Sequence, residues 1–401
     1  MVDLKPEYYE NFSCIGSQCS DTCCQGWQVN VDQKCHNKYL KLKKKVNYKN
    51  LDSFLIKDQN PTSRHFSSIK MKKNELCPFL DRNRLCDIQK KFGKDYLPDT
   101  CKIFPRRTID FDEIKVKTLS LACPEAAKLC LTKKNSMNIK SEDSKERSFL
   151  KIVPSYLHNS FTMVGEKLFN KIYFLFKDKD LDLMSLLFIC EGTLNKQKYL
   201  ERNPEKIDLV FNLIVDESKN IDFFKFDKSE VKLNFLTDIN ALIQNTNPNC
   251  SLKEILFKTH NELVKKKPGL EAIINFKDIE KKYYKNFEKK NYSILRNYFL
   301  NELLGHAQIF TNEIPNCRNR FYLTILCLVI SKLITMSFIS ENNKNLDKQI
   351  LVNAIQKVIK NFGALVLVDK NHEYELHPEV YSALKRIDRN SVFNSLFLLF
   401  S

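Results

Sequence analysis

Glycine is scarce in this 401-residue chain: there are eight, and no two of them lie closer than ten residues. A loop that cradles a phosphate or a dinucleotide needs several glycines within about six to eight residues, because the backbone itself approaches the ligand. The spacing therefore argues against a P-loop nucleotidase and a conventional Rossmann dehydrogenase. It also weakens the case for a doubly wound methyltransferase, whose nucleoside sits over a glycine-rich turn.

Arginine is also scarce, with 12 arginines against 53 lysines and a formal net charge of +17. Because arginine is the preferred reader of phosphates and guanines, we expect no nucleic-acid partner. A protein partner with an acidic patch, attracted over a long range, accounts for the net positive charge better than nucleic acid does. We interpret the KLKKK run, Lys41–Lys45, as a solvated helix face, with substrate steering as the alternative.

The first residues, MVDLKPEYYENF, lack the apolar segment of a secretory signal. The longest apolar run, Phe321–Ile339, is interrupted by Lys332 and flanked by Arg318 and Arg320. It falls short of the roughly 20 uninterrupted apolar residues that span a bilayer, so we predict a buried core helix. We expect a cytoplasmic protein without a membrane span.

Sustained period-two alternation is almost absent, whereas apolar clusters at helical spacing recur between polar breaks after residue 148. Examples are Phe169–Cys190, Leu295–Phe310 and Val352–Val368, the last of which could end in a short strand. We predict a mainly α fold, with a cysteine-rich N-terminal module packed on a multi-helix C-terminal body and no Rossmann signature. The predicted parts are a cysteine module at 1–130, a linker or surface loop at 131–148, and a helical domain at 149–401.

Cysteine is plentiful but unevenly placed, since ten of the fourteen lie within residues 1–130. In a reducing compartment, clustered thiols bind metal or perform redox chemistry more often than they form disulfides. Six residues are interpreted as free buried thiols: Cys35, Cys130, Cys190, Cys250, Cys317 and Cys327. The other eight are candidate metal ligands in two blocks: Cys14, Cys19, Cys23, Cys24, Cys77, Cys86, Cys101 and Cys123.

Two kinds of centre suit these thiols. Zinc takes four tetrahedral ligands, commonly as two close pairs, whereas an iron–sulfur cage collects four thiolates from more distant loops. The adjacent Cys23 and Cys24 are awkward ligands for a single ion, because successive side chains diverge. Eight thiols exceed the four that one centre needs, so either two centres exist or several are bystanders. Arg106 and Arg107 could offset the charge of a thiolate-bound cluster.

The blocks PEYYENFSCIGSQCSDTCCQGWQV, CPFLDRNRLCDIQ, YLPDTCKIFPR and SLACPEAAKL resemble the flagellin lysine-N-methylase family. That family shares its cysteine module with a broader group of zinc- or iron-chelating domains. The resemblance covers residues 6–130, with a weaker echo at Asn291–Leu304. It implies transfer of a methyl group from S-adenosylmethionine to lysine side chains of flagellin, with a [4Fe–4S] cluster on the cysteines.

The catalytic residues and the residues that bind S-adenosylmethionine are not evident from the sequence. Methylation of an amine needs a neutral lysine held close to the sulfonium methyl, and aromatic side chains commonly line such channels. Five aromatics are therefore worth examining: Tyr8, Tyr9, Trp27, Tyr96 and Tyr298.

A radical mechanism is not indicated, because the Cys-x3-Cys-x2-Cys triplet of radical S-adenosylmethionine enzymes is incomplete. Cys19 and Cys23 begin the triplet, but Gly26 holds its third position. The alternative functions are a non-enzymatic zinc- or iron-binding carrier or assembly protein and, third, a zinc-stabilised nucleic-acid binder. The long helical body disfavours a simple metal carrier or assembly protein, and the shortage of arginine disfavours a nucleic-acid binder.

Overall fold

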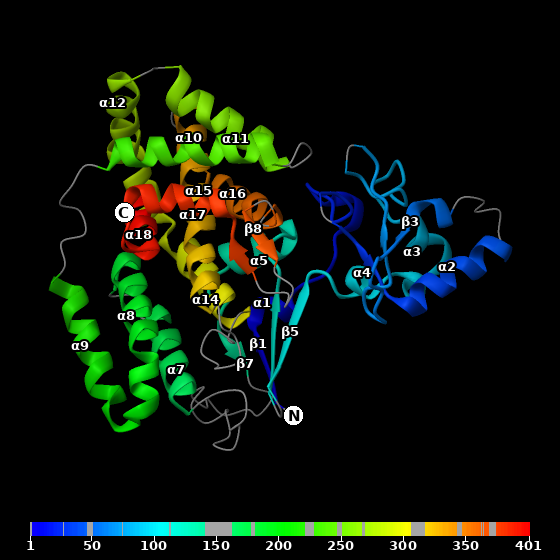
Figure 1. Ribbon diagram of the computed structural model, residues 1–401, viewed down its shortest axis with the longest axis horizontal. Helices are drawn as coiled ribbons and strands as arrows, with labels where there is room; N and C mark the ends of the chain where they lie inside the picture. The colour runs from blue at the N-terminus through cyan, green and yellow to red at the C-terminus, as the bar shows by residue number, and fades with distance from the viewer. Residues whose placement is uncertain are drawn as a thin grey trace.

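The computed structural model describes fifteen segments of the chain, and every structural statement below concerns them. They are residues 2–26, 28–45, 51–73, 75–111, 114–140, 163–177, 181–220, 228–246, 251–266, 269–305, 317–342, 347–361, 363, 365–368 and 374–401. Helices dominate these segments and the sheets are small, so the prediction of a mainly α fold is confirmed. Figure 1 shows a small lobe, which contains α2 and α3, set beside a larger helical body.

The small lobe combines short helices with a three-stranded sheet. The sheet has the order β2 (Asn30–Val31), β4 (Ser67–Ile69), β3 (Leu55–Lys57), and all its pairs are antiparallel. The helical elements are α2 (Gln33–Lys45), α3 (Asp87–Phe92), α4 (Asp99–Ile103), η1 (Gly16–Gln18), η2 (Asp52–Phe54) and η3 (Lys94–Tyr96). Lys41 is exposed on α2 and the next residue, Leu42, is buried, which agrees with the predicted solvated face.

A four-stranded sheet runs from this lobe toward the body. Its order is β5 (Arg106–Phe111), β6 (Ile114–Leu119), β1 (Val2–Pro6), β7 (Ile139–Lys140). β5 and β6 form an antiparallel hairpin, β1 lies parallel to β6, and β7 is antiparallel to β1. The sequence IKVKTL of β6 alternates over its first four residues only, too short a stretch to count as sustained alternation.

The body consists of helices, among which the long α15 packs against α11, α12, α16 and α18. The helices are α1 (Glu7–Glu10), α5 (Pro124–Thr132), α7 (Met163–Lys177), α8 (Leu183–Arg202), α9 (Ile207–Asn220), α10 (Ser229–Thr246), α11 (Ser251–His260), α12 (Leu270–Ile279), α13 (Lys285–Lys290), α14 (Tyr292–Gly305), α15 (Cys317–Glu341), α16 (Lys348–Lys360), α17 (Pro378–Ile387) and α18 (Val392–Phe400). Further elements are η4 (Pro204–Lys206), the π-helical turns η5 (Asn261–Lys265) and η6 (Glu280–Tyr284), and the hairpin of β8 (Val366–Val368) and β9 (Tyr374–Leu376).

The helices predicted from apolar spacing are present. Phe169–Cys190 falls on α7 and α8, and Asp182 begins α8 by accepting a hydrogen bond from the Ser185 amide at 2.9 Å. Val352–Val368 is helical to Lys360, and its end forms strand β8, the alternative that the sequence left open. Leu295–Phe310 is α14 as far as Gly305, and its remaining residues lie outside the described segments.

The predicted core helix at Phe321–Ile339 is also confirmed, as part of α15. One helical stretch in the described segments, Arg318–Glu341, is long and apolar enough to cross a membrane. Eighty-nine per cent of its most apolar window is buried inside the protein. This burial is what a core helix of a helical body requires.

A buried ionic cluster lies between α10, α15 and η6. Lys232 and Lys332 both donate to Glu280, at 2.7 and 2.9 Å, and each lysine side chain is only 3% exposed. Lys332 also donates to the carbonyl of Phe400 at 3.0 Å. Burial, together with the neighbouring Lys332 ammonium, lowers the pKa of Lys232 to about 7. The cluster therefore places two ammonium groups on one shared carboxylate.

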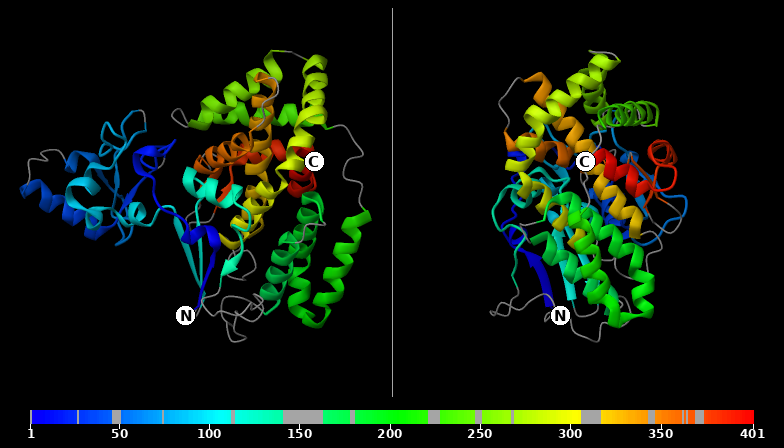
Figure 2. Two further views of the ribbon diagram at one scale, coloured as in Figure 1. Left: turned by 180° about the vertical axis from the view of Figure 1, so that it is seen from behind. Right: turned by 90° about the vertical axis from the view of Figure 1, so that its left-hand side faces the viewer.

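The hydrophobic packing groups the chain differently from the predicted domain division, which stays a prediction. The core of the small lobe uses residues between 29 and 97. The core of the body also takes in residues from both ends of the predicted cysteine module, including Leu4, Tyr8, Leu119 and Leu129. The predicted linker at 131–148 begins within α5 and includes β7, and its residues 141–148 lie outside the described segments. Figure 2 shows the small lobe set apart from the body in a second view.

Candidate functional site

All eight predicted ligand cysteines line one cavity, of about 590 Å³, where the small lobe meets the body. They are Cys14, Cys19, Cys23, Cys24, Cys77, Cys86, Cys101 and Cys123. The chain thus brings together two sequence blocks whose ends are more than a hundred residues apart. Of the six cysteines interpreted as free, the four whose burial is described, Cys35, Cys130, Cys190 and Cys327, are all buried. The burial of Cys317 is not described, and Cys250 lies outside the described segments.

The first cysteine block forms a loop with tight turns. Gly16 has a φ of 57° and Gly26 a φ of 81°, values that glycine adopts without the steric cost of a side chain. The Cys19 amide donates to the Gly16 carbonyl at 3.1 Å, and the Cys24 amide donates to the Thr22 hydroxyl at 3.1 Å. These local bonds set the turns between the cysteines of the loop.

The second block presents its thiols from the starts of short helices. Cys86 precedes α3, Cys123 precedes α5 and Cys101 lies within α4. Burial raises the pKa of Cys123 to about 11, although amides at the start of α5 act in the opposite direction. Amides at a helix start stabilise a thiolate, so these positions suit anionic ligands once a cation is bound.

Cys24 connects the two blocks. Its carbonyl accepts a hydrogen bond from the Cys77 amide at 2.8 Å. A hydrogen bond from Cys23 lowers the pKa of Cys24, but the bond that Cys24 itself makes to Cys77, together with burial, outweighs it and raises that pKa to about 12. The raised pKa keeps the Cys24 thiol protonated, and binding of a metal by Cys24 would displace that proton.

Asp21, a residue that sequence reasoning missed, ties the first loop to α16. Its carboxylate accepts hydrogen bonds from Lys360 at 2.6 Å, from Lys357 at 2.8 Å and from Gln356 at 3.2 Å. Burial opposes ionisation, but the two ammonium groups outweigh it and hold the pKa of Asp21 well below its usual range. Lys360 donates to the Thr22 carbonyl as well, at 2.9 Å. No local signal in the sequence connects positions 335 residues apart or more.

Basic side chains also line the cavity. They are Arg84, Lys90, Lys94, Lys102 and Arg106. The prediction for Arg106 therefore agrees with its position, and its guanidinium lies 5.3 Å from the centre of the Phe12 ring. The prediction for Arg107 was wrong, because successive residues of β5 point to opposite faces. Arg107 pairs instead with Glu302 of α14 at 3.3 Å.

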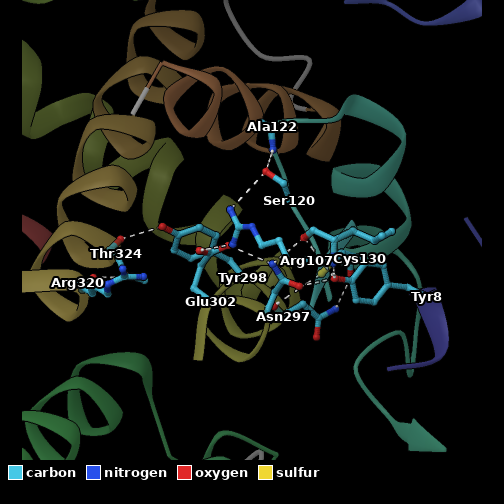
Figure 3. A network of polar contacts seen from close by, with 12 residues as sticks. Tyr8, Arg107, Ser120, Ala122, Cys130, Asn297, Tyr298, Glu302, Arg320 and Thr324 are labelled. Carbon is cyan, nitrogen blue, oxygen red and sulfur yellow. Dashed lines mark hydrogen bonds and ion pairs between the residues drawn. The ribbon is translucent and has the colours of Figure 1, made fainter. Parts of the chain in front are cut away.

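Two of the predicted aromatics belong to a buried polar network between the sheet and α14 (Figure 3). The Tyr8 hydroxyl accepts a hydrogen bond from the Leu119 amide at 2.9 Å and donates to Asn301. Tyr298 donates to the carbonyl of Thr324 at 2.9 Å. These bonds hold β6 and α15 against α14 and leave no role for the two tyrosines at the cavity. Tyr8 is 0% exposed and Tyr298 is 1% exposed.

The close approach of α14 to the sheet depends on Gly305. A methyl group added there would lie 3.1 Å from the Thr118 hydroxyl and 3.3 Å from Arg107 Nη1. Such distances are tighter than ordinary van der Waals contact, so a side chain at this position would push the helix and the sheet apart.

Tyr9 and Tyr96 also lie away from the cavity. Tyr9 is partly buried against the core of the body, and Tyr96 packs on the core of the small lobe. Trp27 lies outside the described segments. A different tyrosine, Tyr39 of α2, lines the cavity and is 1% exposed. Its position inside a helix with apolar residues at Cys35 and Leu42 indicates a buried face, but no sequence signal aims it at the thiols.

The donor set fits a cage-shaped cofactor better than a single ion. In the described segments, no three histidine, cysteine, aspartate or glutamate side chains are placed to hold one metal ion. The eight thiols instead surround a cavity. Their burial varies, from Cys77, which is buried, to Cys14, which is exposed. Four thiolates spread around a space are what an iron–sulfur cluster requires of a protein.

Comparison with known proteins finds relatives with names connected to flagella and to lysine methylation. The chain is 34% identical over 146 residues to flagellar biosynthetic protein FliU of Salmonella muenchen, a match that covers 36% of this chain and 85% of that protein. It is 33% identical over 147 and 148 residues to proteins named lysine-N-methylase from Salmonella choleraesuis and Salmonella typhimurium. Each of these two matches covers 36% of both chains.

The remaining comparisons give no match: no family model and no solved structure resembles this chain. The alignment with FliU covers most of that protein at an identity well above chance similarity. The resemblance drawn from the cysteine blocks is thereby confirmed, and the chain belongs to the family of FliU and the lysine-N-methylases.

Proposed function

We propose that this protein is an S-adenosylmethionine-dependent N-methyltransferase that modifies lysine side chains of flagellin in the bacterial cytoplasm. We propose further that its cysteines hold a [4Fe–4S] cluster. The observation that carries both parts is the convergence of all eight ligand cysteines on one cavity in a chain related to lysine-N-methylases. The name of FliU, a flagellar biosynthetic protein, and the family resemblance support flagellin as the substrate.

The size and lining of the cavity support a role in binding. About 590 Å³ lies within the range of small-molecule sites. The cluster would draw its ligands from the eight cysteines, and it would supply a rigid cross-link between their loops. S-adenosylmethionine would supply the methyl group.

The basic residues of the cavity have a second consequence for a lysine substrate. Arg84, Lys94 and Arg106 create a positive field, which disfavours the charged form of a nearby amine. A lysine near its ordinary pKa of about 10.4 is protonated at neutral pH and cannot attack a methyl group. A substrate lysine that enters this cavity would therefore be shifted toward its reactive, neutral form.

The decisive experiment incubates the anaerobically purified protein with radiolabelled S-adenosylmethionine and unmethylated flagellin. We expect label on flagellin lysines, detected by mass spectrometry of tryptic peptides. An Arg106→Gln variant should transfer less label, with the optimum moved to higher pH, because the cavity is less positive. Lysozyme, a basic protein rich in accessible lysine, serves as a control acceptor and should remain unlabelled. Unlabelled flagellin would exclude the enzymatic function.

The alternative is a zinc- or iron-binding carrier without catalysis, and the same thiols favour it. Metal analysis separates the cases: a brown protein with iron and acid-labile sulfide supports the cluster. A colourless protein that contains zinc alone would exclude it.

A further inference from the structure

Tyr39 of α2 carries a buried hydroxyl group that makes no hydrogen bond within the described segments. The side chain is 1% exposed and lines the cavity that the eight cysteines surround. No other described side chain with a buried polar atom in this condition lines that cavity. Burial of a hydroxyl without a partner costs free energy, because its hydrogen bonds to water are lost and not replaced. The position of Tyr39 therefore indicates a partner inside the cavity.

The Cys35 thiol, one helical turn before Tyr39, does not supply that partner. Burial, and after it the nearby Cys35, raises the pKa of Tyr39, but the contact between the two lacks the geometry of a hydrogen bond. A thiol sulfur is also a weak acceptor, and Cys35 Sγ donates its own proton to the Tyr96 carbonyl at 3.4 Å. The Tyr39 phenol keeps its proton at neutral pH, so it is available as a donor.

The core of the small lobe holds the Tyr39 ring in place. The ring packs edge to face against Phe79, with ring centres 6.0 Å apart and an angle of 66° between the planes. Phe79 packs in the same way against Phe54, at 5.8 Å and 85°, and itself lines the cavity. Interlocked aromatic rings in a close-packed core have little freedom to turn. The Tyr39 hydroxyl therefore stays at the cavity and does not reach solvent.

One carboxylate, that of Asp32, fixes the helix of Tyr39 relative to a candidate ligand. Asp32 Oδ1 accepts a hydrogen bond from the Cys35 amide at 2.9 Å, and Asp32 Oδ2 accepts one from the Asp99 amide at 3.2 Å. Cys35 lies in the first turn of α2, and Asp99 is the first residue of α4. α2 carries Tyr39 and α4 carries Cys101, and both side chains line the cavity. The hydroxyl and the thiol are thus presented by two helices that share an anchor.

We propose that the Tyr39 hydroxyl donates a hydrogen bond to a sulfur of the [4Fe–4S] cluster and thereby raises its reduction potential. This inference rests on the cluster part of the proposed function and goes beyond it, because it assigns a positioning residue that is not a ligand. Hydrogen bonds to the sulfurs are among the features by which a protein sets the potential of a cluster. A donor stabilises the reduced form more than the oxidised form, because the reduced form carries one more negative charge.

The test uses the full chain, purified without oxygen and reconstituted with iron and sulfide. Tyr39→Phe removes the hydroxyl and leaves the ring. Tyr96→Phe is the matched control, because Tyr96 packs against the core of the same lobe but does not line the cavity. We expect about four irons per chain in the native protein and in both variants, since no ligand is changed.

The reduction potential and the spectrum of the reduced protein separate the variants. Redox titration followed by paramagnetic resonance should give a lower potential for Tyr39→Phe and the native potential for Tyr96→Phe. After exchange into heavy water, electron–nuclear double resonance should show an exchangeable deuteron that is coupled to the cluster in the native protein and in Tyr96→Phe but is lost in Tyr39→Phe. A side chain that only fills space would change neither measurement. A native potential in Tyr39→Phe, or a coupling that persists in it, overturns the inference.

The iron-free protein provides a second test. Tyr39→Phe removes a hydroxyl that has no partner there, so its urea midpoint should equal or exceed that of the iron-free native chain. In the loaded protein the order should reverse, because the hydroxyl then has a partner. A lower midpoint for the iron-free variant would show that the hydroxyl is bonded within the protein itself, and the inference would be wrong.

Failure of the inference and failure of the proposed function give different results. If the reconstituted native protein holds no iron, the cluster part of the proposed function fails and the inference fails with it. If the native protein holds the cluster and methylates flagellin while Tyr39→Phe keeps the native potential, the proposed function stands and only the inference fails.

Discussion

Replacing Asp21 with asparagine removes the charge that ties the first cysteine loop to α16 and leaves a nearly isosteric side chain. The Asp21 and Lys360 side chains are each 8% exposed, so their ion pair is buried, whereas Lys357 is 35% exposed. Breaking a buried pair costs about 3 to 5 kcal/mol, because the remaining charge is left without a partner. The Lys357 contact lies closer to solvent and adds less than about 1 kcal/mol.

The expected loss of unfolding free energy for Asp21→Asn is therefore about 3 kcal/mol, a large part of the roughly 5 to 15 kcal/mol of a typical domain. The single tryptophan of the chain, Trp27, follows Asp21 by six residues, so its fluorescence reports on this loop, while far-ultraviolet circular dichroism reports on the helical body. In urea, the fluorescence midpoint should fall by about 1 M, with a smaller fall by circular dichroism. Transitions that separate in this way indicate that the loop detaches before the body unfolds.

A double-mutant cycle with Lys360→Met isolates the pair. Because methionine removes the ammonium that Asp21→Asn would leave buried, the double variant should be more stable than the sum of the single losses indicates. Glu254→Gln on α11 breaks an exposed pair with Lys258 and should not move either midpoint. Strict additivity in the cycle, or equal urea midpoints for Asp21→Asn and the control, would refute the assignment. Asp21 would then not form a stabilising buried ion pair between the loop and α16.

The same pair predicts a pH dependence. The folded pKa of Asp21 lies below its unfolded value of about 3.9, so the stability it contributes is fully present above about pH 4 and is lost as the pH falls further. Native protein should therefore lose stability more steeply than Asp21→Asn on acidification below pH 4. Denaturant titrations from pH 6 to pH 3 measure the difference, and parallel curves for the two proteins would contradict it.

Further perturbations test the body. Glu280→Gln should lower the unfolding free energy by about 3 to 5 kcal/mol, whereas Lys232→Met should cost nothing, because it removes one of two ammonium groups on a single carboxylate. Native stability should rise from about pH 7 to pH 10, where the unfolded chain binds the Lys232 proton and the folded chain does not, and Lys232→Met should abolish the rise. Tyr8→Phe leaves a buried amide and amide oxygen unpaired and should cost about 1 to 3 kcal/mol in urea titrations. Gly305→Ala should cost a similar amount by overpacking, whereas Gly363→Ala, with open space around it, should be silent in thermal melts.

The sequence predicted the fold class and the membership of the thiol site for different physical reasons. Helical periodicity is local, so the spacing of apolar residues in Val352–Val368 was enough to place α16 and the strand that follows it. The cysteines were recognisable because thiols are rare in most chains and here are crowded into one third of the sequence. Neither inference needed knowledge of how distant segments meet.

The features that sequence reasoning missed all depend on contacts between segments that are distant in the sequence. Arg107 was, like its neighbour Arg106, a candidate to offset the charge of a thiolate-bound cluster. The alternation of strand β5 instead directs it to Glu302, which lies 195 residues further on. The sheet itself pairs β1 with β6 in a parallel register that no local pattern specifies. Long-range pairing of this kind is decided by the total packing of the fold, which short windows of sequence do not contain.

Asp21 and the pair Cys23–Cys24 show how the two kinds of information combine. The crowding of thiols in the sequence left open whether one or two centres exist, because spacing alone does not say which direction each thiol faces. Packing fixes the backbone that carries the thiols: the Cys24 carbonyl accepts a hydrogen bond from the Cys77 amide of the small lobe, and Asp21, three residues earlier, bonds to α16 of the body. The loop is therefore held on both sides, and between these contacts the Cys23 and Cys24 thiols are joined by a hydrogen bond, a convergence that spacing in the sequence does not reveal.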